Sequence, residues 1–218
     1  MAVRERNALA GARPRSRTDS SGDATRNLLI EKALELFADH GIDAVSLRQI
    51  GVAIGSGNAS VVAYHFGSKR ALLKAIIQKH VPQMEAQRAA LLAQAVYGGR
   101  DKDLFALLEA MCRPVFEQRA TDGRRRYAGL LWHLNATNWW SERSYSESTP
   151  ALGELLRRIA ALLPRLSQDE YMERMSTLGD MMAGALRRIE HNRLDDRHAE
   201  RIFTRTLRLG CMVLLAHD

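Results

Sequence analysis

Apolar residues recur at intervals of three and four along almost the whole chain after residue 24, and no segment alternates apolar with polar residues as a strand does. This spacing gathers apolar side chains on one face of a helix. Several of these stretches also have recognisable ends, with a Ser, Thr or Asp before the helix and a glycine after it. The pattern therefore predicts an all-α fold.

The first two predicted helices have clear capping residues. Thr25 precedes the stretch RNLLIEKALELFADHGI, and Gly41 can adopt the left-handed conformation that ends a helix. Ser46 and Gln49 have the spacing of a capping box, in which each residue satisfies a backbone amide of the other. A second helix is therefore expected to begin at about residue 46.

The remaining helices follow from the same signals. A short third helix is expected from about Asn58 to Phe66, and Ser68 is expected to cap a fourth that continues into the nineties despite Pro82, which can kink it. Beyond the glycines at 98 and 99 we predict helices at about 103–119, 124–139, 150–163, 168–192 and 197–216.

The positive charge of the chain is unevenly distributed. The formal net charge is +7, and residues 1–80 contain 12 Lys and Arg against 7 Asp and Glu. Residues 81–218 are close to balance, with 20 basic and 18 acidic residues. A basic excess concentrated in one region indicates an anionic partner, nucleic acid first.

The chain divides into three predicted regions. Residues 1–24 are rich in Arg, Ser, Gly and Ala and are expected to form a disordered basic arm, followed by a first domain at 25–81 and a second at 82–218. No segment approaches the roughly 18 apolar residues of a membrane span, nor the about 7–15 of a signal-peptide core. We therefore expect a cytoplasmic, nucleoid-associated protein with no membrane partner.

Residues 46–66 have the pattern of a helix-turn-helix unit. Two short helices are joined by the turn GSGN, and Leu47, Ile50 and Ile54 give the first of them an apolar inner face. Such units place their second helix in the major groove of DNA. The polar residues of the second helix are then expected on its outer face.

At this point the sequence resembles the TetR family of bacterial transcriptional regulators. The resemblance is carried by IEKALELFADHGIDAVSLRQI and by YHFGSKRALL, which occur in the family's order and spacing over residues 25–80. It implies a three-helix DNA-binding domain followed by a larger helical ligand-binding and dimerisation domain. The turn GSGN is one residue longer than the commonest family turn, so two registers of residues 57–61 remain open.

The resemblance implies a set of DNA contacts. The tyrosine and histidine that end the recognition helix face phosphates in the family, and its phenylalanine packs inward. A lysine at the start of the next helix is placed to meet a phosphate beside the helix amides. An amide can pair with adenine, and a small apolar group can touch a thymine methyl. The predicted DNA-binding residues are Ser46, Arg48, Asn58, Ser60, Val61, Tyr64, His65 and Lys69.

The last two predicted helices contain narrow apolar seams. Intervals that alternate three and four suit helix–helix packing, whether within one chain or between two. The resemblance implies a homodimer formed by these helices, which would read a palindromic operator on double-stranded DNA. The predicted interface residues are Tyr171, Met175, Leu178, Met182, Ile202, Thr206, Leu209 and Val213.

A pocket for a small-molecule effector is expected in the second domain, although its apolar residues could equally form an ordinary core. Pockets combine apolar walls with a few polar groups. The candidate lining residues are Cys112, Phe116, Trp132, Asn135, Trp139 and Met181. No cofactor is predicted, and no His, Cys, Asp and Glu spacing points to a metal.

Three other functions remain as alternatives. A redox-responsive regulator would use Cys112 or Cys211, but both lie in apolar stretches that disfavour a thiolate. An enzyme is not expected, because the chain has no nucleophile elbow, phosphate loop or recognisable pair of catalytic carboxylates. A helical interaction module without DNA binding is the third. The leading hypothesis is a repressor released from its operator by a small-molecule effector.

Overall fold

The computed structural model of the protein describes residues 17–56, 60–120, 122–136 and 149–216. All regular secondary structure within these ranges is α-helical, as the sequence pattern predicted. The helices are α1 (Arg17–His40), α2 (Leu47–Ala53), α3 (Val61–Phe66), α4 (Lys69–Tyr97), α5 (Leu104–Glu117), α6 (Arg126–Ala136), α8 (Pro150–Ala161), α9 (Gln168–His191) and α10 (Asp196–Leu215).

The expected capping residues begin several of these helices. Ser46 Oγ accepts a hydrogen bond from the Gln49 amide at 3.2 Å, and the Gln49 side chain accepts one from the Ser46 amide at 2.7 Å. A second capping box starts α9, and Asp195 caps α10 by accepting from the His198 amide at 2.8 Å. Gly41, with φ of +90°, ends α1 as predicted.

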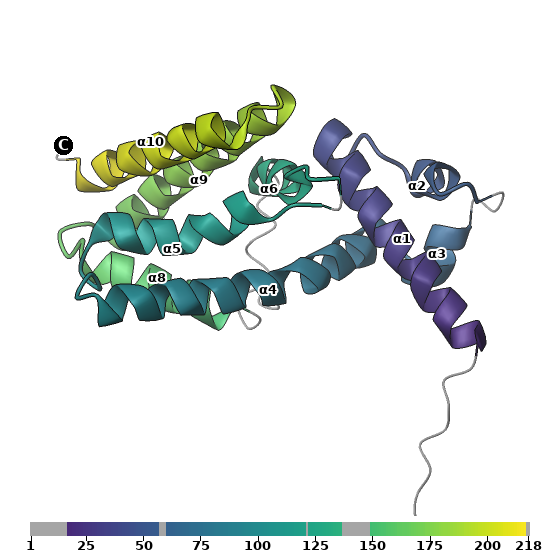
Figure 1. The fold of residues 1–218 in the computed structure, drawn as a ribbon, viewed down its shortest axis with the longest axis horizontal. Coiled ribbons are helices and arrows are strands. Elements are labelled where there is room, and N and C mark those ends of the chain that lie inside the picture. The colour runs from purple at the N-terminus through teal and green to yellow at the C-terminus, as the bar shows by residue number, and fades with distance from the viewer. Residues whose placement is uncertain (1–16, 57–59, 121, 137–148, 217–218) are drawn as a thin grey trace, which may run out of the picture.

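The N-terminal helices form a compact unit around one apolar core. Leu29, Ile30 and Phe37 of α1 are buried against Ile50 of α2 and Val62 of α3. The first turns of α4 complete this core, and Figure 1 shows α1 crossing the start of α4 with α2 and α3 alongside. The local spacing of apolar residues thus fixes which faces of α2 and α3 point away from the core.

The other helices form a bundle that shares α4 with the N-terminal unit. In Figure 1, α4 runs out of that unit along one side of the bundle, α9 and α10 pair on the opposite side, and α5 lies between them. Helix α8 packs on α4 and α5, and α6 packs on both α1 and α9. Helices α4 and α6 therefore connect the two parts of the molecule.

The structure corrects several predicted boundaries. Residues 17–24 are helical, so α1 begins eight residues earlier than Thr25, and the rest of the expected arm at 1–16 lies outside the described residues. Helix α4 continues through Pro82 without a break, so it crosses the expected domain boundary at 81. Helix α3 starts at Val61, three residues later than expected, and α6 is described as far as Ala136, so its expected end at about 139 lies outside the described residues.

The arginines at 124–126 hold α6 against α1 and α9, although a charge run on a helix is usually solvated. Arg124 forms ion pairs with Asp39 of α1 at 3.3 Å and with Glu190 of α9 at 2.5 Å. Arg125 is buried, and its Nε donates to the Phe116 carbonyl at 2.8 Å. The two ion pairs of Arg124 join residues more than sixty positions apart, which sequence periodicity does not reveal.

Candidate nucleic-acid interface and internal cavity

Helices α2 and α3 present a polar surface whose orientation is set by their buried residues. Val62 is fully buried in the N-terminal core, while Tyr64, two positions later, is 85% exposed. Arg48 and Gln49 of α2 are also exposed, with Ile50 buried behind them. The amphipathic pattern therefore leaves one face of each helix open to a partner.

The segment that includes this surface has no acidic residue. Between Asp43 and Glu85 the sequence contains Arg48, Lys69, Arg70, Lys74 and Lys79 and no Asp or Glu. The net charge counted over residues 1–80 also included the acidic residues of α1, which made the basic excess of this segment less apparent. Of the basic residues in this segment, Lys79 pairs with Glu31 of α1 at 2.8 Å, and the exposed Arg48, Arg70 and Lys74 favour the phosphate backbone of DNA at long range.

Two of the predicted contact residues lie at the start of α2. Ser46 is exposed, but its hydroxyl is engaged in the capping box, where it also donates to Gln49 Oε1 at 2.8 Å. Arg48 projects from the first turn and is exposed. Arg48 is therefore the better placed of the two to reach a phosphate or a base edge.

The predicted base readers occupy different environments. Ser60 is exposed at the start of α3, whereas Val61 is partly buried and packs against the apolar core. Asn58 lies outside the described residues, as do its neighbours at 57 and 59. The register of residues 57–61 therefore stays a prediction.

The aromatic triplet that ends α3 separates into outward and inward side chains. Tyr64 is exposed and its ring meets that of His65 edge to face, with 5.2 Å between centroids. Phe66 packs partly on the core, and the Arg26 guanidinium of α1 lies 5.0 Å from its ring centroid. Tyr64 therefore faces outward and Phe66 packs inward, while His65 is partly exposed, and the DNA contacts of Tyr64 and His65 stay predictions.

The ammonium group of Lys69 already donates hydrogen bonds to backbone carbonyls of the protein, so it is only partly available to a phosphate. Its Nζ donates to the carbonyl oxygens of Ile42 at 2.9 Å and of Asp43 at 3.4 Å. The side chain thus fastens the first turn of α4 to the connection between α1 and α2. An ammonium has three N–H donors, so one remains for an anion at the start of α4.

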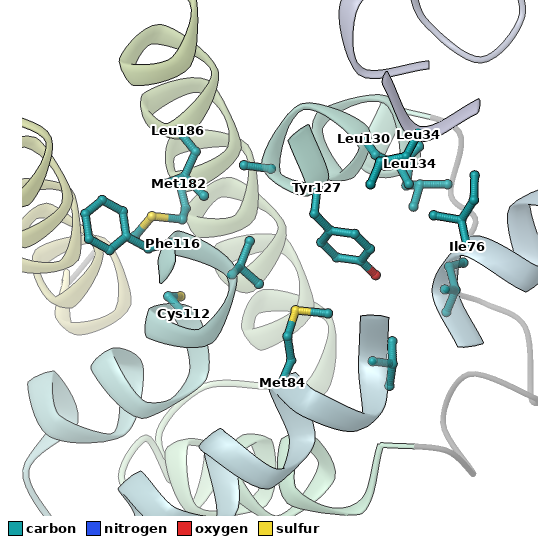
Figure 2. Packing of buried hydrophobic residues seen from close by; sticks show 14 of the residues in the cluster. Leu34, Ile76, Met84, Cys112, Phe116, Tyr127, Leu130, Leu134, Met182 and Leu186 are labelled. Carbon is teal, nitrogen blue, oxygen red and sulfur yellow. The ribbon is translucent and has the colours of Figure 1, made fainter. Parts of the chain in front are cut away.

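The bundle encloses a cavity of about 560 Å³ between α4, α5, α6, α8 and α9. Figure 2 shows Met84, Cys112, Tyr127 and Met182, which come from four of these helices and all line the cavity. Met172 and Ser176 of α9 also line it and are exposed, so the cavity communicates with solvent beside α9. Its volume lies within the range of about 300–1,000 Å³ typical of small-molecule sites.

Only part of the predicted pocket set lies at this cavity. Cys112 lines it, whereas Phe116 stacks on Phe203 of α10 with 4.4 Å between ring centroids. Met182 lines the cavity and the predicted Met181 does not, because one residue rotates a helical side chain by about 100°. Trp139 and the side chains of Trp132 and Asn135 lie outside what the structure describes.

A buried ion pair forms one polar edge of the cavity. Arg88 of α4, which is 4% exposed, donates from Nη1 to Glu85 Oε1 at 2.8 Å and from Nε to the Met111 carbonyl at 3.1 Å. The other oxygen of Glu85 accepts from the amides of Ala151 at 2.8 Å and Leu152 at 3.3 Å. Glu85 therefore caps the start of α8 and neutralises Arg88 at the same time.

Neither cysteine is disposed to react. Burial raises the pKa of the Cys112 thiol to about 12, although nearby Arg88 opposes the shift. Burial and the carboxylate of Asp103 raise the pKa of Cys211 as well. Since the thiolate is the reactive form, these shifts argue against a redox switch at either position.

The predicted interface seam lies mostly inside the protomer on α9. Leu178 and Met182 are buried, and both line the cavity together with Met175. Tyr171 is buried, and its hydroxyl donates to the Leu156 carbonyl at 3.0 Å. Tyr171, Leu178 and Met182 are therefore not available to a second chain in this conformation, whereas Met175 is partly exposed.

On α10 the predicted seam is more accessible. Leu209 is exposed, and Ile202 and Val213 are partly exposed. Thr206 is buried and its hydroxyl donates to the Ile202 carbonyl at 2.9 Å. The exposed apolar residues of α10 also include Met212 and Leu215, which the seam had omitted.

His80 of α4 lies where the N-terminal unit meets the bundle. Its Nδ1 accepts from the Gln118 side-chain amide at 2.9 Å, and its Nε2 lies 3.7 Å from Glu31 of α1. Its ring packs on Tyr127 of α6, with 5.5 Å between ring centroids. Burial lowers the pKa of His80, the carboxylate of Glu31 opposes this, and Lys79 adds to it.

The lowered pKa predicts a loss of stability on acidification. An unfolded histidine takes up its proton near pH 6.5, whereas folded His80 does so at a lower pH, so the unfolded state binds more protons between the two values. The free energy of unfolding, measured with urea from pH 7.5 to 5.5, should fall less steeply in His80→Gln than in the wild type. The exposed His198→Gln serves as the control. Equal slopes for wild type and His80→Gln would contradict this prediction.

No described helix is long and apolar enough to cross a membrane. No group of three or more His, Cys, Asp or Glu within the described ranges could hold a metal ion.

Comparison with known families matches both parts of the chain. Residues 29–76 match the family model described as bacterial regulatory proteins, tetR family, and residues 109–208 match that described as tetracyclin repressor-like, C-terminal domain. A comparison with curated proteins found no match. The first match runs from the middle of α1 through α2 and α3 into the first turns of α4, and the second runs from within α5 through α6, α8 and α9 into α10. The chain therefore belongs to the TetR family of bacterial regulatory proteins.

Proposed function

We propose that this DNA-binding transcriptional regulator is a homodimeric repressor that a small-molecule effector releases from a palindromic operator. The observation that carries the DNA-binding part is the outward face of α2 and α3, where Arg48 and Tyr64 are exposed above a buried core. The acid-free segment between Asp43 and Glu85 supplies the favourable electrostatic field. Because its partner is the chromosome, we place the protein in the cytoplasm.

Within this proposal the contacts at α2 and α3 have separate tasks. Arg48, Tyr64 and His65 contact the DNA, and the exposed Ser60 and the undescribed Asn58 read base edges. Lys69 positions α4 through its two carbonyl contacts and offers its remaining N–H to a phosphate. Phosphate contacts fix the register of the protein on the duplex, and base contacts supply specificity.

The proposed dimer uses the outer face of α10 with the neighbouring surface of α9. The exposed apolar side chains of Leu209, Met212 and Leu215 support this assignment. A two-fold axis presents two α3 helices to successive major grooves, so the half-sites should lie about one helical turn apart.

The proposed release mechanism depends on α4. Lys69 at its first residue belongs to the DNA-binding unit, and Met84, fifteen residues further on, lines the cavity. A rise of 1.5 Å per residue separates them by about 22 Å along one continuous helix. A ligand shifts the equilibrium only if it binds the DNA-incompetent arrangement more tightly than the competent one.

A selection from random duplex DNA tests the DNA-binding part of the proposal. The purified chain should enrich inverted repeats and bind them more weakly as salt is raised. Tyr64→Ala should then raise the Kd about tenfold, since a hydrogen bond to a charged group is worth about 1.5–3 kcal/mol. Arg48→Ala should reduce the slope of log K against log salt by about one.

Tyr97→Ala is the matched control for the tyrosine variant. Tyr97 is 97% exposed at the far end of α4, so its loss should leave DNA affinity unchanged. Binding that shows no sequence preference and is equal in all variants would reject the proposal and favour a helical interaction module.

A further inference from the structure

The chemical class of the effector can be inferred from the walls of the cavity. Five methionines line it, namely Met84, Met111, Met172, Met175 and Met182. The methionine side chain is unbranched and polarisable, so it adapts to ligands of different outline and makes favourable contacts with aromatic rings. Most of the other lining residues are leucine, valine or alanine, or the tyrosine ring of residue 127.

The charges on the described walls of the cavity disfavour cationic and anionic ligands. Arg88 is the single charged side chain among the described residues that line it, and Glu85 neutralises this charge at 2.8 Å. A cationic ligand would find no carboxylate along the described walls. An anionic ligand would have to compete with Glu85, whose second oxygen is already committed to the amides of α8.

The remaining polar groups are uncharged or have donors to spare. The raised pKa of the Cys112 thiol keeps it protonated at neutral pH, so it adds no negative charge to the wall. Arg88 has five N–H donors, of which hydrogen bonds to Glu85 and to the Met111 carbonyl engage two. Its side chain is almost completely buried and lines the cavity, so an acceptor atom of a ligand can reach it.

We propose that this cavity binds an uncharged, largely apolar organic molecule, such as a planar aromatic compound, that presents one hydrogen-bond acceptor to Arg88. Its role as the effector rests on the function proposed above. Burying an uncompensated ionic group in such a cavity would forfeit its hydration, whereas a neutral ring system replaces water and empty space by contacts with methionine.

Two fluorescent probes that share one aromatic frame test the charge preference directly. N-phenyl-1-naphthylamine is uncharged, and 8-anilino-1-naphthalenesulfonate adds a sulfonate to the same frame. Fluorescence titration of the full chain should give a Kd about tenfold or more lower for the neutral probe. Equal affinities, tighter binding of the sulfonate, or no binding of either probe would overturn the proposal.

A blocking variant assigns the signal to the cavity. Gly153 of α8 lines the cavity, and a Cβ added there meets nothing within 4 Å. Gly153→Leu should fill the space and raise the Kd of the neutral probe about tenfold. Leucine has a higher helix propensity than glycine, so the thermal midpoint of unfolding should be preserved. Ala161→Leu adds the same side chain to an exposed position of α8 and should change neither value. An unchanged Kd in Gly153→Leu would place the probe elsewhere and overturn the proposal.

Operator binding measured on the same samples separates this inference from the function on which it rests. If the neutral probe enters the cavity while the protein stays on its DNA, the ligand class stands and release by an effector is rejected. If the sulfonate binds more tightly and releases the DNA, the proposed function stands and the ligand class is rejected.

Discussion

Glu85→Ala is expected to lower the free energy of unfolding by about 3–5 kcal/mol, the usual cost of removing one member of a buried ion pair. The variant leaves the guanidinium of Arg88 buried, with the Met111 carbonyl as an acceptor but without its carboxylate. It also removes the acceptor for the amides of Ala151 and Leu152, which lie at the start of α8. Urea unfolding at neutral pH measures the loss.

A double variant distinguishes the charge effect from simple loss of volume. In Glu85→Leu/Arg88→Met both charges are removed and the volume is largely kept, so most of the lost stability should return. Glu154→Ala provides a surface control, because Glu154 pairs with Arg157 and Arg158 at the partly exposed side of α8 and its loss should leave stability nearly unchanged. A Glu85→Ala variant as stable as the wild type would show that the ion pair is not formed in solution.

The sequence predicted what is local and failed where distant segments meet. The capping box at Ser46 and the left-handed Gly41 are encoded within a few residues, and both are confirmed. The apolar stripe on α9 was equally clear, but its spacing does not say which neighbour covers it. Met182 of this stripe lines the cavity, whereas the resemblance to the family had placed Met182 at the dimer interface.

The buried polar contacts were harder to predict for a related reason. Glu85 and Arg88 look like an ordinary surface pair at a helical interval of three. They are buried only because α8 packs on α4. The amide of Ala151, which Glu85 caps, lies sixty-six positions later in the chain. The ion pairs of Arg124 are equally invisible in the sequence, because Asp39 and Glu190 lie far from it along the chain.

Gly129→Ala is expected to destabilise the protein by about 1–3 kcal/mol and to weaken operator binding, because α6 and α1 cross at this glycine. A Cβ at position 129 would lie 3.0 Å from Ala38 Cβ, 3.2 Å from the Ala38 carbonyl oxygen and 3.3 Å from Ala38 Cα. Two of these atoms belong to the backbone, so no side-chain rotation relieves the contact. Helix α1 must move away from α6.

Gly153→Ala, which also changes a glycine inside a helix, should change the free energy of unfolding in the opposite direction. A Cβ there meets nothing within 4 Å, so the higher helix propensity of alanine should stabilise the protein by about 0.5–1 kcal/mol. Urea unfolding and titration of operator DNA, run on both variants, check the pair.

Because α1 forms part of the core behind α2 and α3, a shift of α1 transmits the strain at Gly129 to the DNA-binding face. If Gly129→Ala loses stability but keeps full operator affinity, the contact between α1 and α6 does not couple the bundle to DNA, and α4 alone connects them.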